Sequence, residues 1–410
     1  MARYAWAFSA LEDTERDEDY GPGGFFPLKL GDTIKPPAIN SSTHYRILAK
    51  LGHGSFSTVW LAHATGDSGE AEGAPGRAMV AIKTLRASET AANREVALLQ
   101  RLRAQDGTVP LVVQLLEHFT AQSPNGIHQM LVMEPVVPLR KVIAHLRPHT
   151  KSIIRQMVEG IGFIHEHGVV HGGKYHNIGV ALEGLDRFSE EEFWSLSGSP
   201  DTSPLVPLSR ERNPASYPAY LTSPINMLEF VKDGMPGFLR NEPRIRIFDL
   251  GCGRFADEAP NAEPVMNLCY AAPELAIPAL LNYNVNKSLC QNWRSDIWSL
   301  ACTTFEIVLG EMLVSAPSDV ALPIYVSAAC GGAPPEWASW FLRAAEQLHE
   351  HTSETADAFW AEKVEVMKRK QTAKDFDAHR LAQMLRCMLK IDPEARLSTV
   401  QLLQAPFFGA

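Results

Sequence analysis

The chain has 410 residues, which is too long for one hydrophobic core and indicates two lobes or domains of ordinary size. Hydrophobic residues make up 45% and charged residues 21%, the composition of a packed globular protein, and no apolar run approaches the roughly 18 to 20 residues needed to span a bilayer. The net charge of −9 disfavours nonspecific binding to nucleic acid and is compatible with a basic peptide as partner.

The first residues, MARYAWAFSALEDTERDEDYG, lack a cationic leader followed by a long hydrophobic stretch and a small-residue cleavage site, so secretion is not expected. The six cysteines lie far apart in the second half of the chain, without a C-x-x-C pair that could clamp a metal. We therefore expect reduced thiols in a protein of the cytoplasm or the nucleus, outside any membrane.

Residues 45–64, YRILAKLGHGSFSTVWLAHA, are predicted to form a strand, a tight turn and a second strand, because apolar residues alternate on both sides of a pair of glycines. Gly52 and Gly54 would let the backbone approach a phosphate closely, since no side chain blocks the contact. Taken alone, this G-x-G pattern followed by Ser57 also fits an ordinary hairpin.

The next apolar strand, MVAIKTL, carries a single lysine, Lys83, and twelve residues later the helical segment NREVALLQRL can turn Glu95 inward. A lone strand lysine is usually a solvated charge, but a lysine paired with a helix glutamate is oriented onto nucleotide phosphates. Further along, residues 130–139 (MLVMEPVVPL) are predicted to be a buried strand that runs into a linker. Glu134 to Val136 lie where an adenine could bond to backbone groups.

Together these segments resemble the small lobe of a protein kinase, and the resemblance continues to the C-terminus. Asp249 begins a D-L-G triplet similar to the D-F-G element, whose aspartate holds magnesium. Glu274 ends an A-P-E triplet, and Asp296 opens an apolar helix as in the large lobe of kinases. Near the end of the chain, Arg396 resembles the buried partner of the A-P-E glutamate. Elements in this order over residues 45–408 favour the kinase fold.

The resemblance implies an α+β, bilobal protein-kinase fold, with a small β-rich N-lobe that holds one main helix and a larger, mostly helical C-lobe. The expected parts are an N-terminal lead-in at 1–44, the N-lobe at 45–137, a first part of the C-lobe at 138–182, a spacer insert at 183–243 and the remaining C-lobe at 244–410. The insert is rich in Ser, Pro, Glu and Asn, so most of it is predicted to be flexible.

Within kinases, the lead-in EDYGPGGFFPLKLGDTI, the segment FSTVWLA and the position of the insert resemble the SR-protein kinases, a CMGC-type serine/threonine kinase group. That group phosphorylates serines in Arg/Ser-rich proteins. The resemblance implies ATP and Mg²⁺ as cofactors, and a protein substrate or partner, such as an Arg/Ser-rich splicing-type protein. It implies no direct contact with nucleic acid, and a monomer.

The resemblance also assigns site residues. Catalytic roles fall to Lys83, Glu95, Lys174, Asn177 and Asp249. Nucleotide contacts fall to Gly52, Gly54, Ser57, Val59, Lys83, Glu134 and Val136. Asn177 and Asp249 would hold the metal.

One expected residue is missing from the catalytic loop. His171 to Asn177, HGGKYHN, stand where kinases carry H-R-D-x-K-x-x-N, and the segment is one residue short. The position of the catalytic aspartate is Gly173 when the alignment starts from His171, and Gly172 when it is counted back from Asn177. Both alignments lose the carboxylate. His176 is the local side chain that could take a proton near neutral pH, although a loop histidine is usually solvated or packed.

Three functions therefore stay open. The chain could be an active kinase in which His176 or a neighbouring group replaces the missing aspartate. It could also be a pseudokinase that uses the fold as a binding scaffold, which the missing carboxylate favours. It could also be a small-molecule phosphotransferase of the aminoglycoside-kinase type, whose H-G-D-x-x-x-x-N loop has a similar sequence, but Glu274 and Arg396 argue against it.

The number of histidines in this region, His165, His167 and His171, suggests a zinc site. Core or capping roles are favoured instead, because no cysteine or carboxylate completes a tetrahedral set of ligands.

Overall fold

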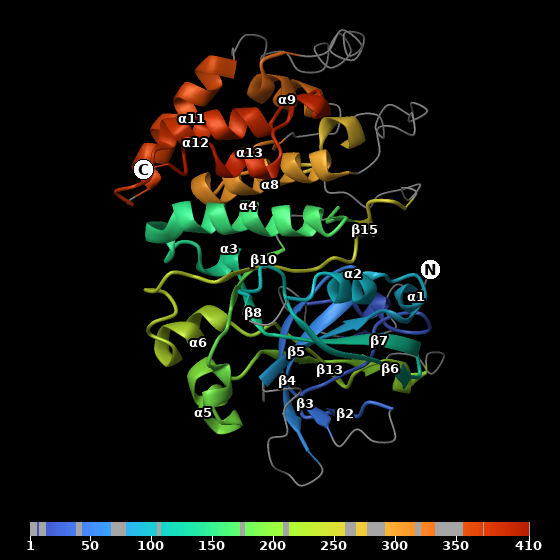
Figure 1. Ribbon diagram of the computed structural model, residues 1–410. Coiled ribbons are helices and arrows are strands. Elements are labelled where there is room, and N and C mark those ends of the chain that lie inside the picture. The colour runs from blue at the N-terminus through green and yellow to red at the C-terminus, as the bar shows by residue number, and fades with distance from the viewer. Residues whose placement is uncertain are drawn as a thin grey trace. The chain divides into compact units, whose positions relative to one another are not determined.

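The structure is a computed structural model (Figure 1), and it divides the chain into two compact units. The first unit comprises Met1–Arg103, Val113–Val137 and Val180–Asn241, and the second comprises Ala104–Val112, Pro138–Gly179 and Glu242–Ala410. The structure describes residues 14–37, 43–66, 79–104, 108–172, 177–205, 213–258, 268–276, 292–315, 321–332, 356–371 and 373–409, and the backbone alone of 6–7 and 206–207. The mixed α+β class expected from the sequence is confirmed.

The first unit is built on a six-stranded antiparallel sheet with the strand order β2-β3-β4-β5-β7-β6 (Figure 1). Its strands are β2 (Thr33–Ile34), β3 (His44–His53), β4 (Ser57–Thr65), β5 (Met79–Leu85), β6 (Leu115–Ser123) and β7 (Gly126–Met133). All seven residues of β5 are buried, because this strand has a neighbour on each side and both of its faces are covered. The predicted strand, turn and strand over residues 45–64 are confirmed by β3 and β4.

Apolar alternation explains how the sheet builds its core. Tyr45, Ile47 and Trp60 point to one face, where they join a buried cluster with residues of β5, β6 and β7. Two short helices accompany the sheet, α1 (Ala87–Thr90) directly after β5 and α2 (Glu95–Arg101), which contacts β6. Burying this apolar surface is the main source of stability for the unit.

The N-terminal lead-in belongs to the same unit. After the 3₁₀ turn η1 (Asp17–Asp19), Tyr20 and Phe25 are buried against Leu205 and Leu221 from the insert. The insert therefore completes a small hydrophobic cluster together with residues that are almost 200 positions earlier in the chain.

The insert is folded over most of its described length, and this differs from the expectation of a flexible spacer. It contains η3 (Leu185–Arg187), α5 (Glu190–Ser197), β11 (Thr202–Pro204), β12 (Val206–Pro207), η4 (Pro214–Ser216), β13 (Tyr220–Thr222) and α6 (Met227–Gly234). Strand β11 pairs with β13, and β12 pairs with β1 (Trp6–Ala7), both in antiparallel fashion.

Aromatic packing is the physical reason for this difference. Phe193 of α5 and Phe230 of α6 are fully buried, with ring centroids 5.0 Å apart, and Phe188 packs on Phe230 at 5.1 Å. Ser189 begins α5 with a capping box in which its hydroxyl accepts from the Glu192 amide. A few well-placed aromatic residues thus fold a segment whose average composition is polar.

The second unit is mainly helical (Figure 1). Its helices are α3 (Leu139–Val142), η2 (Arg147–His149), α4 (Thr150–Glu166), α8 (Trp293–Leu309), α9 (Leu322–Cys330), α11 (Ala356–Lys370), α12 (Ala378–Met388), η7 (Pro393–Ala395) and α13 (Thr399–Leu403). Helix α4 contacts both α8 and α13, and α11 packs against α8, α9 and α12. Asn292 caps the start of α8, and Gly310, with φ 72°, ends it.

The second unit also contains short strands. They are β9 (Val169–Val170), which pairs with β15 (Arg254–Phe255), and β14 (Ile245–Ile247), which packs on α4. Gly160 of α4 allows this close packing, because a Cβ there would lie 2.7 Å from Ile247 Cδ1. Two of the five passages of the chain between the units fall within strands, in β8 (Val136–Pro138) and in β10 (Ile178–Ala181), and the others lie at 103–104, 112–113 and 241–242.

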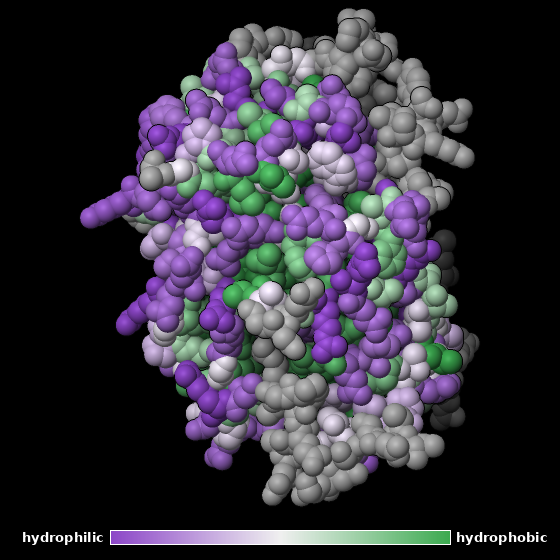
Figure 2. Space-filling model, viewed as in Figure 1, coloured by the Kyte–Doolittle hydropathy of each residue, from purple (hydrophilic) through white to green (hydrophobic). Residues whose placement is uncertain are grey.

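The visible surface is largely hydrophilic on the face drawn in Figure 2, with smaller apolar areas between the polar side chains. Among the described residues, the large hydrophobic side chains that are exposed are scattered singly: Phe56, Val109, Ile127, Met312 and Val400. In the described part of the chain, every helix is too short or too polar to cross a bilayer.

Candidate nucleotide and phosphotransfer site

A row of residues across the sheet of the first unit places Lys83 beside the glycine-rich loop. Gly52, Val59 and Lys83 are directly opposite one another on β3, β4 and β5, so their side-chain positions share one face of the sheet. Ser57 begins β4 two residues before Val59 and lies on the same face. A Cβ added at Gly52 or at Gly54 would meet nothing within 4 Å, so internal packing does not require glycine at either position.

Lys83 and Glu95 form the ion pair that the sequence predicts. Lys83 Nζ donates to Glu95 Oε2 at 2.6 Å, with 8% of the lysine side chain exposed and none of the glutamate side chain. Glu95 is the first residue of α2, and its amide is bound by the Asn93 side chain. The pair holds the ammonium group at a fixed position on the sheet face, which is how a lysine can bind a phosphate in a defined geometry.

Glu134 has a structural use that the sequence did not reveal. Its carboxylate accepts from the Gln114 amide at 3.0 Å, and its own amide donates to the Gln114 carbonyl at 3.2 Å. The Pro135 carbonyl accepts from the Leu182 amide at 3.1 Å. An adenine contact in this segment would therefore use the Glu134 carbonyl and the backbone of Val136.

Asn177 and Asp249 are brought together in the second unit, although 72 positions separate them. Asn177 Nδ2 donates to Asp249 Oδ2 at 3.2 Å and to the Asp249 carbonyl at 3.4 Å. Among the described residues, Asp249 is the one residue other than glycine with positive φ, at 59°. A side chain in this left-handed region costs free energy, and such strain concentrates at functional sites.

The Asn177 and Asp249 pair fits Mg²⁺ by the chemistry of its donors. Carboxylate and amide oxygens suit this ion, which usually takes one or two protein carboxylates and completes its shell with water and substrate phosphates. Within the described residues, no group of three or more His, Cys, Asp or Glu side chains could hold a metal. Two oxygen-bearing side chains without a protein cage are the arrangement expected for a metal shared with a nucleotide.

Asp296 anchors the start of the catalytic loop, a role that the sequence did not predict. Its carboxylate accepts from the amides of His171 and Gly172 at 2.9 and 3.0 Å and from His165 Nε2 at 2.9 Å. Burial raises the pKa of Asp296, but the hydrogen bond and charge of His165 and the Gly172 amide outweigh it, so the pKa lies below its usual value. The aspartate stays ionised and keeps the loop backbone fixed.

The three histidines of this region have the structural roles that were favoured over zinc. His165 contacts Asp296, His167 Nδ1 bonds the Phe163 carbonyl at 2.8 Å near the end of α4, and His171 is fully buried. Burial lowers the pKa of His171 despite the nearby charges of Asp296 and Asp249, so its imidazole is neutral at neutral pH.

The middle of the loop, Gly173, Lys174, Tyr175 and His176, lies outside the described residues. Gly172 is described and has φ 64°, a left-handed conformation that favours glycine. The predicted roles of Lys174 and His176, and the choice between Gly172 and Gly173 for the aspartate position, stay predictions.

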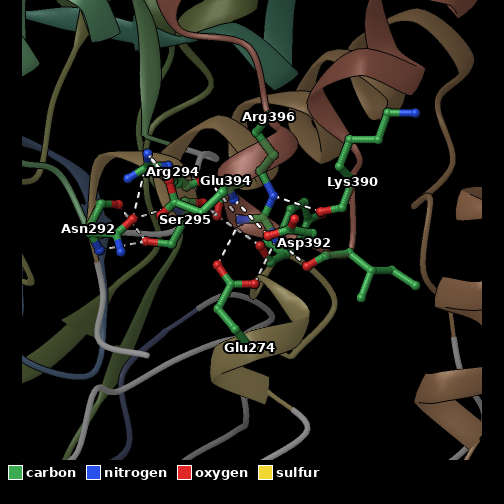
Figure 3. Close-up of polar contacts among 11 residues, drawn as sticks. Glu274, Asn292, Arg294, Ser295, Lys390, Asp392, Glu394 and Arg396 are labelled. Carbon is green, nitrogen blue, oxygen red and sulfur yellow. Dashed lines mark hydrogen bonds and ion pairs between the residues drawn. The ribbon is translucent and has the colours of Figure 1, made fainter. Parts of the chain in front are cut away.

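Glu274 and Arg396 form the buried pair expected from the sequence. The guanidinium donates to both carboxylate oxygens at 2.7 Å, and also to the carbonyls of Lys390 at 2.8 Å and Arg294 at 3.0 Å. Figure 3 shows these bonds converging on Arg396, beside the cap that Asn292 forms on α8. The pair ties the segment around Glu274 to the last helices of the unit.

Comparisons with known proteins agree with this geometry. Residues 238–408 match the family model for the protein kinase domain. The serine/threonine-protein kinase SRPK of Physarum polycephalum is 27% identical over 320 residues, which cover 73% of this chain and 67% of that protein. The serine/threonine-protein kinase spk-1 of Caenorhabditis elegans is 34% identical over 175 residues, which cover 39% of this chain but only 16% of that kinase.

A solved structure shows the same fold. The crystal structure of a kinase domain superposes with a TM-score of 0.55 at 17% sequence identity, covering 93% of this chain and 98% of that one. The family model, the relatives and the shared fold, together with the Lys83–Glu95 and Asn177–Asp249 pairs, show that this chain has the protein-kinase fold and is similar in sequence to kinases of the SRPK type.

Proposed function

We propose that the chain binds ATP with Mg²⁺ and transfers the γ-phosphate to serine in Arg/Ser-rich proteins. The observation that carries the proposal is the preservation of both polar pairs, Lys83 with Glu95 and Asn177 with Asp249. A buried ion pair and an aspartate in a strained backbone conformation, both at the positions expected for a nucleotide site, support this use, because strain and buried charge concentrate at functional sites. The net charge of −9 suits a basic peptide substrate.

Each group of residues has a stated task in this proposal. The loop from Gly52 to Ser57 covers the phosphates, Lys83 binds the α and β phosphates, and Asn177 and Asp249 hold the metal. Bound Mg²⁺ would neutralise charge that develops on the phosphate oxygens. The serine oxygen forms the new bond to phosphorus, and the bond between the γ-phosphorus and the leaving oxygen of ADP breaks.

Transfer is expected to be slow, because neither Gly172 nor Gly173 offers a carboxylate for the serine proton. Positioned acid-base catalysis is typically worth about 10² to 10⁴-fold in rate. His176 is the loop side chain that can accept the proton near neutral pH. Phosphoryl transfer depends mainly on positioning and charge stabilisation, so the remaining residues would still support it.

The missing carboxylate specifically favours a second function, a pseudokinase that binds nucleotide and presents a surface to a partner. The two functions share the nucleotide site and differ in turnover. Measuring binding and transfer separately therefore distinguishes them.

The test uses the full chain and three substitutions. ATP·Mg²⁺ binding is measured by thermal shift, and transfer by labelled phosphate incorporation into an Arg/Ser-repeat peptide. Lys83→Met is expected to weaken binding sharply and abolish transfer, whereas Lys29→Met, which removes an exposed lysine of the same unit, should change neither. Gly173→Asp is expected to raise the transfer rate without changing ATP affinity.

Each outcome has a definite meaning. Unchanged ATP affinity in Lys83→Met would remove the nucleotide-site assignment. Binding without transfer, in the wild type and in Gly173→Asp alike, would reject the kinase and support the pseudokinase.

A further inference from the structure

Arg86 holds the tip of the glycine-rich loop from outside the proposed nucleotide site. It directly follows β5, and its amide donates to the Phe56 carbonyl at 2.9 Å. Its guanidinium, through Nη1, donates to the Ser55 carbonyl at 3.2 Å. Two successive carbonyls of the loop are therefore bound by one residue.

This arrangement also orients the loop amides. In a planar trans peptide the C=O and the following N–H point in opposite directions. Since the carbonyls of Ser55 and Phe56 point to Arg86, the amides of Phe56 and Ser57 point away from it. Successive amides that point the same way form a concave site for an anion such as phosphate.

Arg86 is itself held by the N-terminal lead-in. The same Nη1 donates to Asp19 Oδ1 at 3.1 Å, and the guanidinium lies 4.9 Å from the centre of the Phe25 ring. The Arg86 and Asp19 side chains are 26% and 31% exposed, so the pair is partly shielded from water. The contacts with Asp19 and Phe25 restrict the rotamers of Arg86 and keep its guanidinium group directed at the loop.

The turn that carries Asp19 and Phe25 is anchored on the start of α1, the helix that follows β5. A Cβ at Gly24 would lie 2.3 Å from the Asp19 carbonyl, so the turn closes this tightly only because glycine stands there. The carbonyls of Gly23 and Gly24 accept from the amides of Ser88 and Ala87, each at 3.0 Å. The turn is thus fixed through backbone bonds that do not involve the Arg86 side chain.

From these contacts we propose that the lead-in turn at residues 19–25 positions the glycine-rich loop for nucleotide phosphates through Arg86. Asp19 and Arg86 are positioning residues, because neither is assigned a contact with the nucleotide. The inference rests on the proposed function for its consequence, ATP affinity. Its structural part, the tether itself, can be measured without any nucleotide.

The experiment compares the full-length wild type with Asp19→Asn, Arg86→Ala, the double variant and Asp19→Glu. Lys29→Ala is the matched control, because it breaks an ion pair with Asp32 in the same lead-in without touching the loop. Hydrogen exchange is measured without nucleotide at the two amides whose bonds hold the loop, that of Gly54, which donates to the Ser57 carbonyl, and that of residue 86, which donates to the Phe56 carbonyl. The Kd for ATP·Mg²⁺ is measured separately.

Faster exchange at the loop is expected in Asp19→Asn and Arg86→Ala, with the Kd raised about two- to fivefold and about tenfold respectively. Because Asp19 acts through Arg86, the double variant should match Arg86→Ala, and Asp19→Glu should restore most of the affinity. Lys29→Ala should behave as the wild type.

Loop exchange that is unchanged in Arg86→Ala would overturn the tether, and additive effects in the double variant would overturn the coupling through Arg86. If the wild type binds no ATP, the proposed function fails instead, and the exchange data still decide the tether. Loss of protection throughout the first unit, rather than at the loop, would reduce Arg86 to a general structural role and reject the proposal.

Discussion

Arg396 is the residue on which the second unit depends most clearly. Its side chain is fully buried and bonds Glu274 twice, so its removal leaves an uncompensated carboxylate in the interior. Replacement by methionine, Arg396→Met, is expected to lower the free energy of unfolding by about 3 to 5 kcal/mol. Urea denaturation followed by circular dichroism measures the change.

Arg380 provides the control for this substitution. It lies on α12 in the same unit, is 44% exposed and pairs with Asp377, so Arg380→Met should cost less than about 1 kcal/mol. Equal midpoints for the two variants would show that the buried pair does not stabilise the unit.

For single residues, a contact could be predicted where a sequence motif marks both partners. The pairs Lys83 with Glu95 and Glu274 with Arg396 follow from short motifs that mark both partners. The partners of Asp296 do not follow, because folding brings its carboxylate to amides about 125 positions earlier, and backbone groups leave no mark in the sequence.

Helices α5 and α6 of the insert depend on one aromatic contact. Phe230 is fully buried between Phe188 and Phe193, so Phe230→Ala should cost about 3 to 5 kcal/mol and loosen both helices. Limited proteolysis of the folded protein should then cut within residues 183–234. Glu191→Ala, an exposed change on α5, should leave the digestion pattern unchanged, and equal resistance of the Phe230 variant would contradict the packing role.

The insert also shows why elements can escape prediction. The buried apolar residues of the insert are isolated among polar residues in the sequence. Two of them, Leu205 and Leu221, pack against Tyr20 and Phe25 of the lead-in. Periodicity within a window of residues cannot detect a partner so far away. The strands β3, β4 and β5 were predictable because each carries its own apolar pattern.

For the whole molecule, stability should depend on pH, because each unit buries a neutral histidine. His128 bonds the Leu85 carbonyl and the Ser123 hydroxyl, and burial lowers its pKa, as it does that of His171. Unfolded histidine binds a proton below about pH 6.5, so the unfolded state then holds more protons and stability falls as the pH drops.

At alkaline pH the thiol of Cys330 has a similar effect. Burial raises its pKa to about 12, so above about pH 8.5 the thiol loses its proton only in the unfolded state, and stability declines.

Thermal unfolding at pH 7.5 and pH 5.5 tests the acidic side. The midpoint of the wild type should fall at the lower pH, and it should fall less in His128→Gln and His171→Gln, which cannot titrate. Equal losses in all three proteins would show that neither histidine contributes to the pH dependence.

The cluster of Tyr20, Phe25, Leu205 and Leu221 has a consequence for how the chain is made. Its two halves are about 200 residues apart, a distance that a ribosome needs roughly 10 to 40 seconds to translate. The first unit therefore cannot complete its packing while only its own early strands have emerged. Tyr20 and Phe25 stay without their final partners until the insert has been synthesised, when residues 242–410 of the second unit are still to be made. During this interval the nascent chain exposes apolar surface of the kind that chaperones protect.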